Sequence, residues 1–244
     1  MLSRAMRALA ALTLCAGVFS SHATASDFDL FAGGATPEKF LYFTGFDLWR
    51  YGGSVHGGLR WSPHGVDHDG FTIKALIAEG AYRYTSGTRD IRGINFTGSV
   101  MPGWQFVRGK FIAILLAGLD VQHHRFLPDD PANPAHGTHL GARVNADLWW
   151  EPNATMMSAA SLSASSIGNS YWARAAIGWR MMEKFWIGPE AIALGDRTFH
   201  QYSAGLHLTA LKANHFEWSF ASGYTRDQNG RAGLYGRMGM LARR

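Results

Sequence analysis

The chain has 244 residues, of which 47% are hydrophobic and 17% charged, and its formal net charge is +5. This length and apolar content fit one large all-β domain or two small domains, and they exclude a chain that is disordered throughout. The positive charge is too small and too dispersed along the sequence to indicate nucleic-acid binding. A single cysteine leaves no thiol pair for a disulfide and excludes a cysteine-based zinc site.

The first 25 residues have the three parts of a secretory signal peptide. Arg4 and Arg7 form a basic region, residues 8–19 are apolar, and the small-residue sequence "ATA" ends at Ala25. An apolar run of about 12 residues is shorter than the roughly 20 of a spanning helix, so we expect cleavage after Ala25 rather than a membrane anchor. A lipoprotein signal is disfavoured because leucine precedes the cysteine. Cleavage removes the cysteine and both arginines, and it lowers the formal charge from +5 to +3.

Polar and glycine-rich breaks divide the remaining chain into about twelve segments with the character of β-strands. The longest apolar run, residues 111–119, is too short for a helical membrane span. Residues 27–34, before the strands, are either an extra short strand or a periplasmic lead-in. The predicted strands are residues 40–50, 52–62, 70–84, 92–107, 110–125, 137–150, 154–165, 169–181, 184–194, 198–211, 214–225 and 231–242.

Alternating side chains give the predicted strands one apolar and one polar face. In residues 139–150, one set of alternate residues is apolar from Leu140 to Trp150, whereas the other set carries Arg143 and Asp147. This period of two predicts a strand whose faces meet different surroundings.

The run "GNSYWARAAIGWRMM" shows the same alternation with aromatic residues at both ends. Tyr171 and Trp179 belong to the apolar face and lie roughly 26 Å apart along an extended strand, close to the apolar band of about 25 Å in an outer-membrane barrel. Arg174 and Arg180 share the opposite face. The pattern therefore predicts a lipid-facing side with aromatic edges and a polar side that points into a lumen.

The predicted strand 70–84 breaks the alternation. Lys74 and Glu79 are an odd number of residues apart, so they cannot share one face of a regular strand. For both to face the same side, one extra residue has to be inserted into the strand. We therefore expect a β-bulge near Ala75.

The predicted connections alternate in length. If the first strand starts in the periplasm, the periplasmic turns after the fourth, sixth, eighth and tenth strands are short, whereas the extracellular loops are mostly longer. This asymmetry is typical of outer-membrane barrels, with the long connection 62–70 as the exception. A soluble sandwich or lipocalin-like barrel has the same alternation. The aromatic strand ends favour a single all-β domain, residues 26–244, folded as an antiparallel outer-membrane barrel of about twelve strands.

A set of polar side chains is expected to face the lumen of this barrel. An unpaired buried charge is costly, so we expect these groups to form ion pairs that fill a narrow, plugged interior. The alternative is a polar conduit or a docking surface for a sugar polymer, with Trp149, Trp172 and Trp186 as stacking faces. The predicted polar network consists of Lys74, Asp120, Arg143, Asp147, Arg174, Arg180, Glu190, Glu217 and Arg237.

Metal binding is not indicated by the sequence. Adjacent strand residues point to opposite faces, so His123 and His124 cannot bind one ion from a regular strand. Turn chemistry accounts for the acidic residues in the loops, and no spacing matches a specific metal motif. The other candidate ligands considered are Asp67, His68, Asp69, Asp129 and Asp130. We predict neither a metal nor any other cofactor.

An enzyme of acyl chemistry is the alternative from another functional class, because small outer-membrane barrels include lipid hydrolases. Candidate residues are Ser203, His207, His215 and Glu217, but no Gly-x-Ser-x-Gly elbow accompanies them. Hydroxyl and imidazole groups that line a polar lumen explain these residues without catalysis, so no catalytic residue is predicted.

Several stretches of the chain resemble a known family, the cellulose biosynthesis protein BcsS family of proteobacteria. The resemblance runs from about Asp27 to Arg244. It is carried by "TGFDLWRYGG", "GGLRWSPHGVDHDGF", "AGLDVQHH", "PANPAHGTHLGARVNADLWWEP", "SSIGNSYWARAAIGWR", "IGPEAIALGD" and "FEWSFASGYTRDQNGRAGLYGRMGMLARR".

The resemblance implies an envelope protein of the outer membrane that accompanies a bacterial cellulose synthase, with no established catalytic activity and no assigned binding residue. We therefore expect a non-catalytic outer-membrane barrel that supports cellulose production or export. Its expected partners are outer-membrane lipid and either the synthase machinery or nascent cellulose, contacted through residues 127–136 or 62–70. A lipid hydrolase or a soluble periplasmic barrel that binds a glycan or lipid is the alternative.

Overall fold

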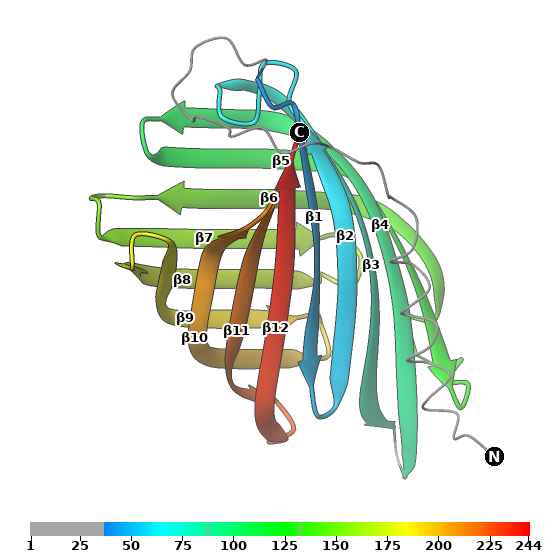
Figure 1. The fold of residues 1–244 in the computed structure, drawn as a ribbon. Helices are drawn as coiled ribbons and strands as arrows, with labels where there is room; N and C mark the ends of the chain where they lie inside the picture. Colours follow the sequence, from blue (N-terminus) through cyan, green and yellow to red (C-terminus); the bar gives the residue numbers. More distant parts are fainter. Residues whose placement is uncertain (1–36, 87, 132) are drawn as a thin grey trace, which may run out of the picture. The chain divides into compact units, whose positions relative to one another are not determined.

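The computed structural model of the chain describes residues 37–86, 88–131 and 133–244. Within these residues, twelve antiparallel strands pair in chain order and β1 pairs with β12, so the sheet closes into a barrel (Figure 1). The strands are β1 (Phe40–Trp49), β2 (Gly52–Trp61), β3 (Gly70–Ser86), β4 (Arg89–Arg108), β5 (Phe111–Leu127), β6 (Gly137–Trp150), β7 (Met156–Ser165), β8 (Tyr171–Met181), β9 (Phe185–Gly195), β10 (His200–Ala213), β11 (Phe216–Asp227) and β12 (Ala232–Arg243).

The expected all-β barrel of about twelve strands is confirmed. The predicted signal peptide, residues 1–25, and the segment 27–34 lie outside the described residues. Over the part of the chain that the structure describes, no helix is long and apolar enough to cross a membrane.

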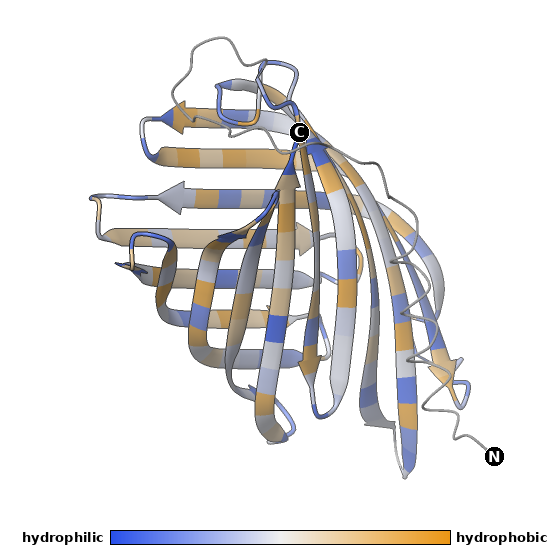
Figure 2. Cartoon of the chain, viewed as in Figure 1, coloured by the Kyte–Doolittle hydropathy of each residue, from blue (hydrophilic) through white to orange (hydrophobic). Residues whose placement is uncertain are grey.

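The two faces of the barrel wall differ as the alternation predicts. Leu140, Leu234 and Leu119 point outward with 74%, 74% and 66% of their surface exposed, whereas Asp120 and Thr225 point inward and are buried. Figure 2 shows the resulting alternation of apolar and polar bands along the strands. Soluble barrels and sandwiches bury their apolar set, so this wall has the opposite arrangement.

Aromatic side chains mark both edges of the outer apolar face. Phe71, Trp104 and Trp150 lie outward near the end of the barrel that holds the C-terminus, which we call the terminal end. Tyr202 and Tyr224 lie outward near the opposite end, which we call the loop end because it carries the nine-residue connection between β5 and β6. Aromatic side chains at both edges of an apolar band are typical of the interfacial girdles of transmembrane barrels.

The bulge expected near Ala75 is wrong. β3 pairs with β2 and β4 in unbroken register, so Lys74 faces the lumen and Glu79 faces outward between Val55 and Phe96. The odd spacing is resolved by leaving one carboxylate on the outer face, not by inserting an extra residue.

A bulge occurs instead in β10, where the register shifts between Leu208 and Leu211. Ala210 has a positive φ of 64°, a conformation that L-residues seldom adopt. Because two β10 residues oppose one residue of β11, the bulge turns Lys212 inward, opposite Glu217.

The connection 62–69 between β2 and β3 packs onto the barrel at the terminal end. Gln105 of β4 is fully buried, and its side-chain amide donates to the backbone carbonyls of Val66 and His68, at 2.7 and 2.8 Å. Asp69 pairs with the Arg108 guanidinium and accepts the Val107 N–H. Strand β4 thus holds in place the connection 62–69, which is the long connection on the side where the sequence predicts short turns.

Acid should release the Asp69 contact. The hydrogen bonds from Arg108 and from the Val107 N–H hold the pKa of Asp69 below its usual range, so the contact is present above the ordinary pKa of about 4 and is lost as pH falls through the lowered value. We expect D69N to accelerate hydrogen exchange at the Val107 amide at neutral pH. D129N, at the loop end, is the control, and unchanged exchange in D69N would contradict the contact.

Candidate functional site: the barrel lumen

The lumen consists of a packed half near the loop end and an open half near the terminal end. Buried residues from β9, β11 and β12 form a cluster in the packed half: Ile192, Ala221 and Tyr235, covered by Trp49 and Trp172. These residues come from one side of the ring of strands, from β8 through β12 to β1, and they pack the interior on that side. The open half contains a cavity of about 1130 Å³.

A buried carboxylate, Glu190 of β9, organises the packed half. Its Oε2 accepts from Arg174 Nε of β8 at 2.8 Å and from Arg237 Nη2 of β12 at 2.5 Å. Its Oε1 accepts from Tyr235 Oη at 2.9 Å. Asp47 of β1 lies 4.0 Å from Arg237 Nε and balances the second cation. Because β10 and β11 lie between β9 and β12 in the sheet, these bonds span two intervening strands on the inner side of the wall.

Two facing glycines make room for the Tyr235 ring. Gly205 of β10 and Gly223 of β11 are paired across the strands. A Cβ at Gly205 would lie 2.6 Å from Tyr235 Oη, and a Cβ at Gly223 would lie 2.8 Å from the ring. Side chains at these positions would displace the ring, so the glycines allow Tyr235 to reach Glu190.

A second buried carboxylate, Asp120 of β5, has no exposed surface and holds the wall between β5 and β7. Arg143 of β6 donates to both its oxygens, at 2.9 and 3.0 Å. Ser165 Oγ and the Gln122 amide donate at 2.6 and 2.8 Å. Such two-pronged arginine contacts are strong and directional, so Asp120 is fully satisfied.

The cavity in the open half, here called the vestibule, reaches the turns at the terminal end of the barrel. Its walls carry a cationic excess, nine lysine or arginine residues against five aspartate or glutamate residues. The basic residues are Arg60, Lys74, Lys110, Arg174, Arg180, Lys184, Lys212, Arg237 and Arg243, and the acidic residues are Asp67, Asp147, Glu151, Glu183 and Glu217.

Ion pairs fix part of this wall. Lys74 Nζ of β3 lies 3.3 Å from Asp147 Oδ2 of β6, across two intervening strands. Arg180 Nη2 donates to Glu151 Oε2 at 3.0 Å, and its guanidinium lies over the Trp186 ring at 4.3 Å. The cation covers one face of Trp186, so that face is closed to a sugar ring.

All nine residues of the predicted polar network point inward. Seven belong to the ion pairs above, Arg180 pairs with Glu151 rather than with a predicted acid, and within the described residues Glu217 forms no ion pair. The three tryptophans separate: Trp149 and Trp186 line the vestibule, whereas Trp172 lies in the packed half. The structure therefore does not assemble one aromatic track.

Several residues that face the lumen were not predicted from the sequence. Arg60 lies on the polar set of β2, so alternation could have indicated it. Asp47 shares its face of β1 with Leu41, Phe43 and Trp49, so alternation gives no signal for it. Glu151 lies in a turn, and no strand pattern extends to it. Tyr235 was missed because its apolar ring gives no sign of the hydrogen bond it makes.

The considered metal ligands take other partners. Asp67 pairs with Arg243 at 3.1 Å, and Asp129 lies 3.1 Å from His136 Nε2. His123 faces outward and His124 faces inward. Over the described ranges, no group of three or more His, Cys, Asp or Glu residues is placed to hold a metal ion. The remaining acids, Asp69 and Asp130, bond to Arg108 and to Tyr84 respectively.

The candidate hydrolase residues are not brought together. Ser203 Oγ donates to Thr225 Oγ1 at 2.7 Å, whereas His207 lies 2.8 Å from Thr209 Oγ1 and 3.1 Å from the Ile177 carbonyl. Ser203 and His207 are four residues apart along one strand, roughly 13 Å, too far for a nucleophile and its base. His215 and Glu217 lie beyond the bulge at the terminal end, distant from Ser203.

Comparison with known protein families shows which family this chain belongs to. Residues 41–244 match the model of the family described as "Cellulose biosynthesis protein BcsS". The chain belongs to this family. The match covers all twelve strands of the BcsS-family barrel except the first residue of β1. No curated protein matches the sequence.

Solved structures resemble the BcsS-family barrel at low sequence identity. The "KdgM porin" is 9% identical with a TM-score of 0.44, covering 83% of this chain and 98% of the porin. The β domain of the Bordetella autotransporter BrkA is 10% identical with a TM-score of 0.48, covering 85% and 99%. "LpxR from Salmonella typhimurium" is 10% identical with a TM-score of 0.45, covering 83% and 99%. These likenesses concern the fold alone.

Removal of the Glu190 charge should destabilise the barrel. E190Q leaves the inward guanidiniums of Arg174 and Arg237 without their carboxylate, and breaking one partner of a buried pair costs about 3–5 kcal/mol in the free energy of unfolding. The measurement is urea unfolding of the refolded protein in lipid vesicles, followed by tryptophan fluorescence. E217Q is the matched control, because Glu217 faces the lumen without an ion pair; equal losses in the two variants would contradict the central role of Glu190.

Proposed function

We propose that this BcsS-family chain is an outer-membrane barrel that supports cellulose biosynthesis or export by a non-catalytic, structural role. The observation that carries the proposal is the inverted wall: exposed leucines and aromatic rings outside, buried ion pairs inside. A lipid bilayer is the environment that covers such an outer face favourably. The same inversion disfavours the soluble periplasmic barrel.

The vestibule is the part of the barrel suited to a partner. With both chain ends of the barrel in the periplasm, it opens toward the periplasm, where a glucan chain or a component of the synthase would meet it. Trp149 is a half-buried ring in its wall. Arg60 faces the cavity, and its Nε is buried without a hydrogen-bond partner among the described residues. The apolar face of a pyranose can stack on an aromatic ring, and a sugar hydroxyl can accept a hydrogen bond from an unsatisfied donor.

The packed half limits what the vestibule can do. Ion pairs and aromatic rings from β8, β9, β12 and β1 project into the lumen between the vestibule and the loop end. A polymer that entered the vestibule would therefore stop there unless these contacts opened. The proposal is accordingly a docking and scaffolding role on the periplasmic side, not passage of the polymer through this barrel.

Membrane placement predicts a specific behaviour on a gel. The protein should fractionate with the outer membrane, and an unheated sample should migrate differently from a boiled one, because a closed barrel resists detergent until heated. Recovery in the soluble periplasmic fraction, without a heat-dependent shift, would contradict the proposal.

Loss of the gene should change cellulose production. In a strain that makes cellulose, we expect deletion to lower the mass of secreted cellulose or to alter fibre architecture, and the wild-type gene to restore both. R60Q should restore less than the outer-face control R226Q. Unchanged cellulose after deletion would refute the functional proposal, whereas full rescue by R60Q would refute only the role of the vestibule.

A further inference from the structure

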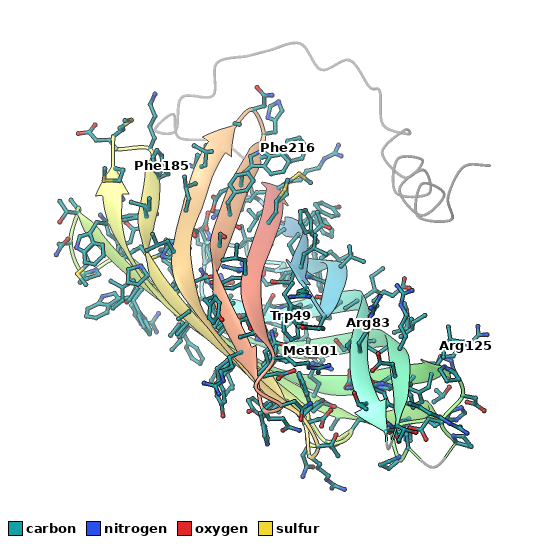
Figure 3. All side chains as sticks on the ribbon, turned by 90° about the horizontal axis from the view of Figure 1, so that it is seen from below. Trp49, Arg83, Met101, Arg125, Phe185 and Phe216 are labelled. Carbon is teal, nitrogen blue, oxygen red and sulfur yellow. The ribbon has the colours of Figure 1, made fainter. Side chains whose placement is uncertain are left out.

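Three arginines face outward near the loop end of neighbouring strands. Arg83 of β3 lies directly opposite Arg92 of β4, and Arg125 of β5 lies opposite Ile94, two residues along β4 from Arg92. All three side chains are exposed. Figure 3 shows Arg83 and Arg125 far from Phe185 and Phe216, which mark the terminal end.

Within the described residues, these arginines form no ion pair, and none of the three guanidiniums takes part in a side-chain hydrogen bond. Two acids share their face: Asp90 accepts Thr85 Oγ1 at 3.3 Å, and Glu79 lies four residues from Arg83 along β3. Like charges directly opposite across two strands repel, so the Arg83 and Arg92 pair favours an external anion.

The surroundings identify the kind of anion. Immediately toward the middle of the wall, the same outer face carries Ile94, Phe96 and Val121, and the exposed apolar surface continues from there. The arginines therefore stand at the boundary between the apolar band and water. Guanidinium groups suit phosphate because their planar donors can grip two oxygens at once.

We propose that Arg83, Arg92 and Arg125 form a binding site for the phosphate groups of an anionic outer-leaflet glycolipid, with its acyl chains lying on the adjacent apolar wall. The inference rests on the membrane placement in the proposed function. A lipid, rather than free phosphate, is the occupant because the cluster is continuous with the surface that the bilayer covers. Binding would anchor this side of the barrel in the outer leaflet.

The test compares lipids that differ only in phosphate. The full barrel is refolded in detergent micelles and titrated with bisphosphorylated lipid A or with its dephosphorylated form, and bound lipid is counted by native mass spectrometry. R83Q/R92Q/R125Q should lose about tenfold or more in apparent affinity for the phosphorylated lipid, since each contact is a charge-assisted hydrogen bond. R226Q is the matched control, an exposed outward arginine at the same end of β11 opposite Tyr202.

The outcomes separate this site from the membrane placement. Equal affinity of the triple variant and the wild type, or equal binding of the two lipids by the wild type, would overturn the site. A heat-dependent gel shift shows that each variant has folded before titration. If the wild type is found in the soluble fraction, the proposed function fails; if it inserts and does not discriminate phosphate, only this inference fails.

Discussion

The pleat of a β-strand sends alternate side chains to opposite sides, and closure of the sheet confines one of these sets inside a barrel. In this chain the confined set carries charges, so each must find a partner or keep contact with water. Glu190 and Asp120 meet that demand through arginines on other strands, and for Glu190 one of these arginines lies on a strand that is not its neighbour. Such pairs add little net stability in general, but they set how the strands face one another.

At the terminal end, the charges inside the barrel are compensated differently. There the cations outnumber the acids, and side-chain pairing alone cannot neutralise the wall. These charges line the cavity of about 1130 Å³ at this end. The two ends of the barrel interior therefore differ: the cavity lies toward the terminal end, whereas the Tyr235 cluster lies toward the loop end.

The outer face follows from the opposite requirement. Exposed leucines and aromatic rings have no partner within the chain, and only an apolar surrounding relieves that exposure. The outward arginines near the loop end fit this picture, since they begin where the apolar band stops.

The sequence by itself determined the strands, their faces and the all-β class, because a period of two and turn residues are local properties. Closure of the sheet depends on the pairing of β1 with β12, which only the tertiary structure decided. The sequence also selected inward residues such as Arg174 and Glu190, since alternation alone assigns a face. Only the tertiary structure decided their partners: Arg180 meets Glu151 from a turn, and Tyr235 reaches Glu190 through the space left by two glycines. It likewise placed the bulge in β10 instead of at Ala75 and separated Trp172 from the vestibule. These features depend on register and distance between strands far apart in the chain, which no local pattern encodes.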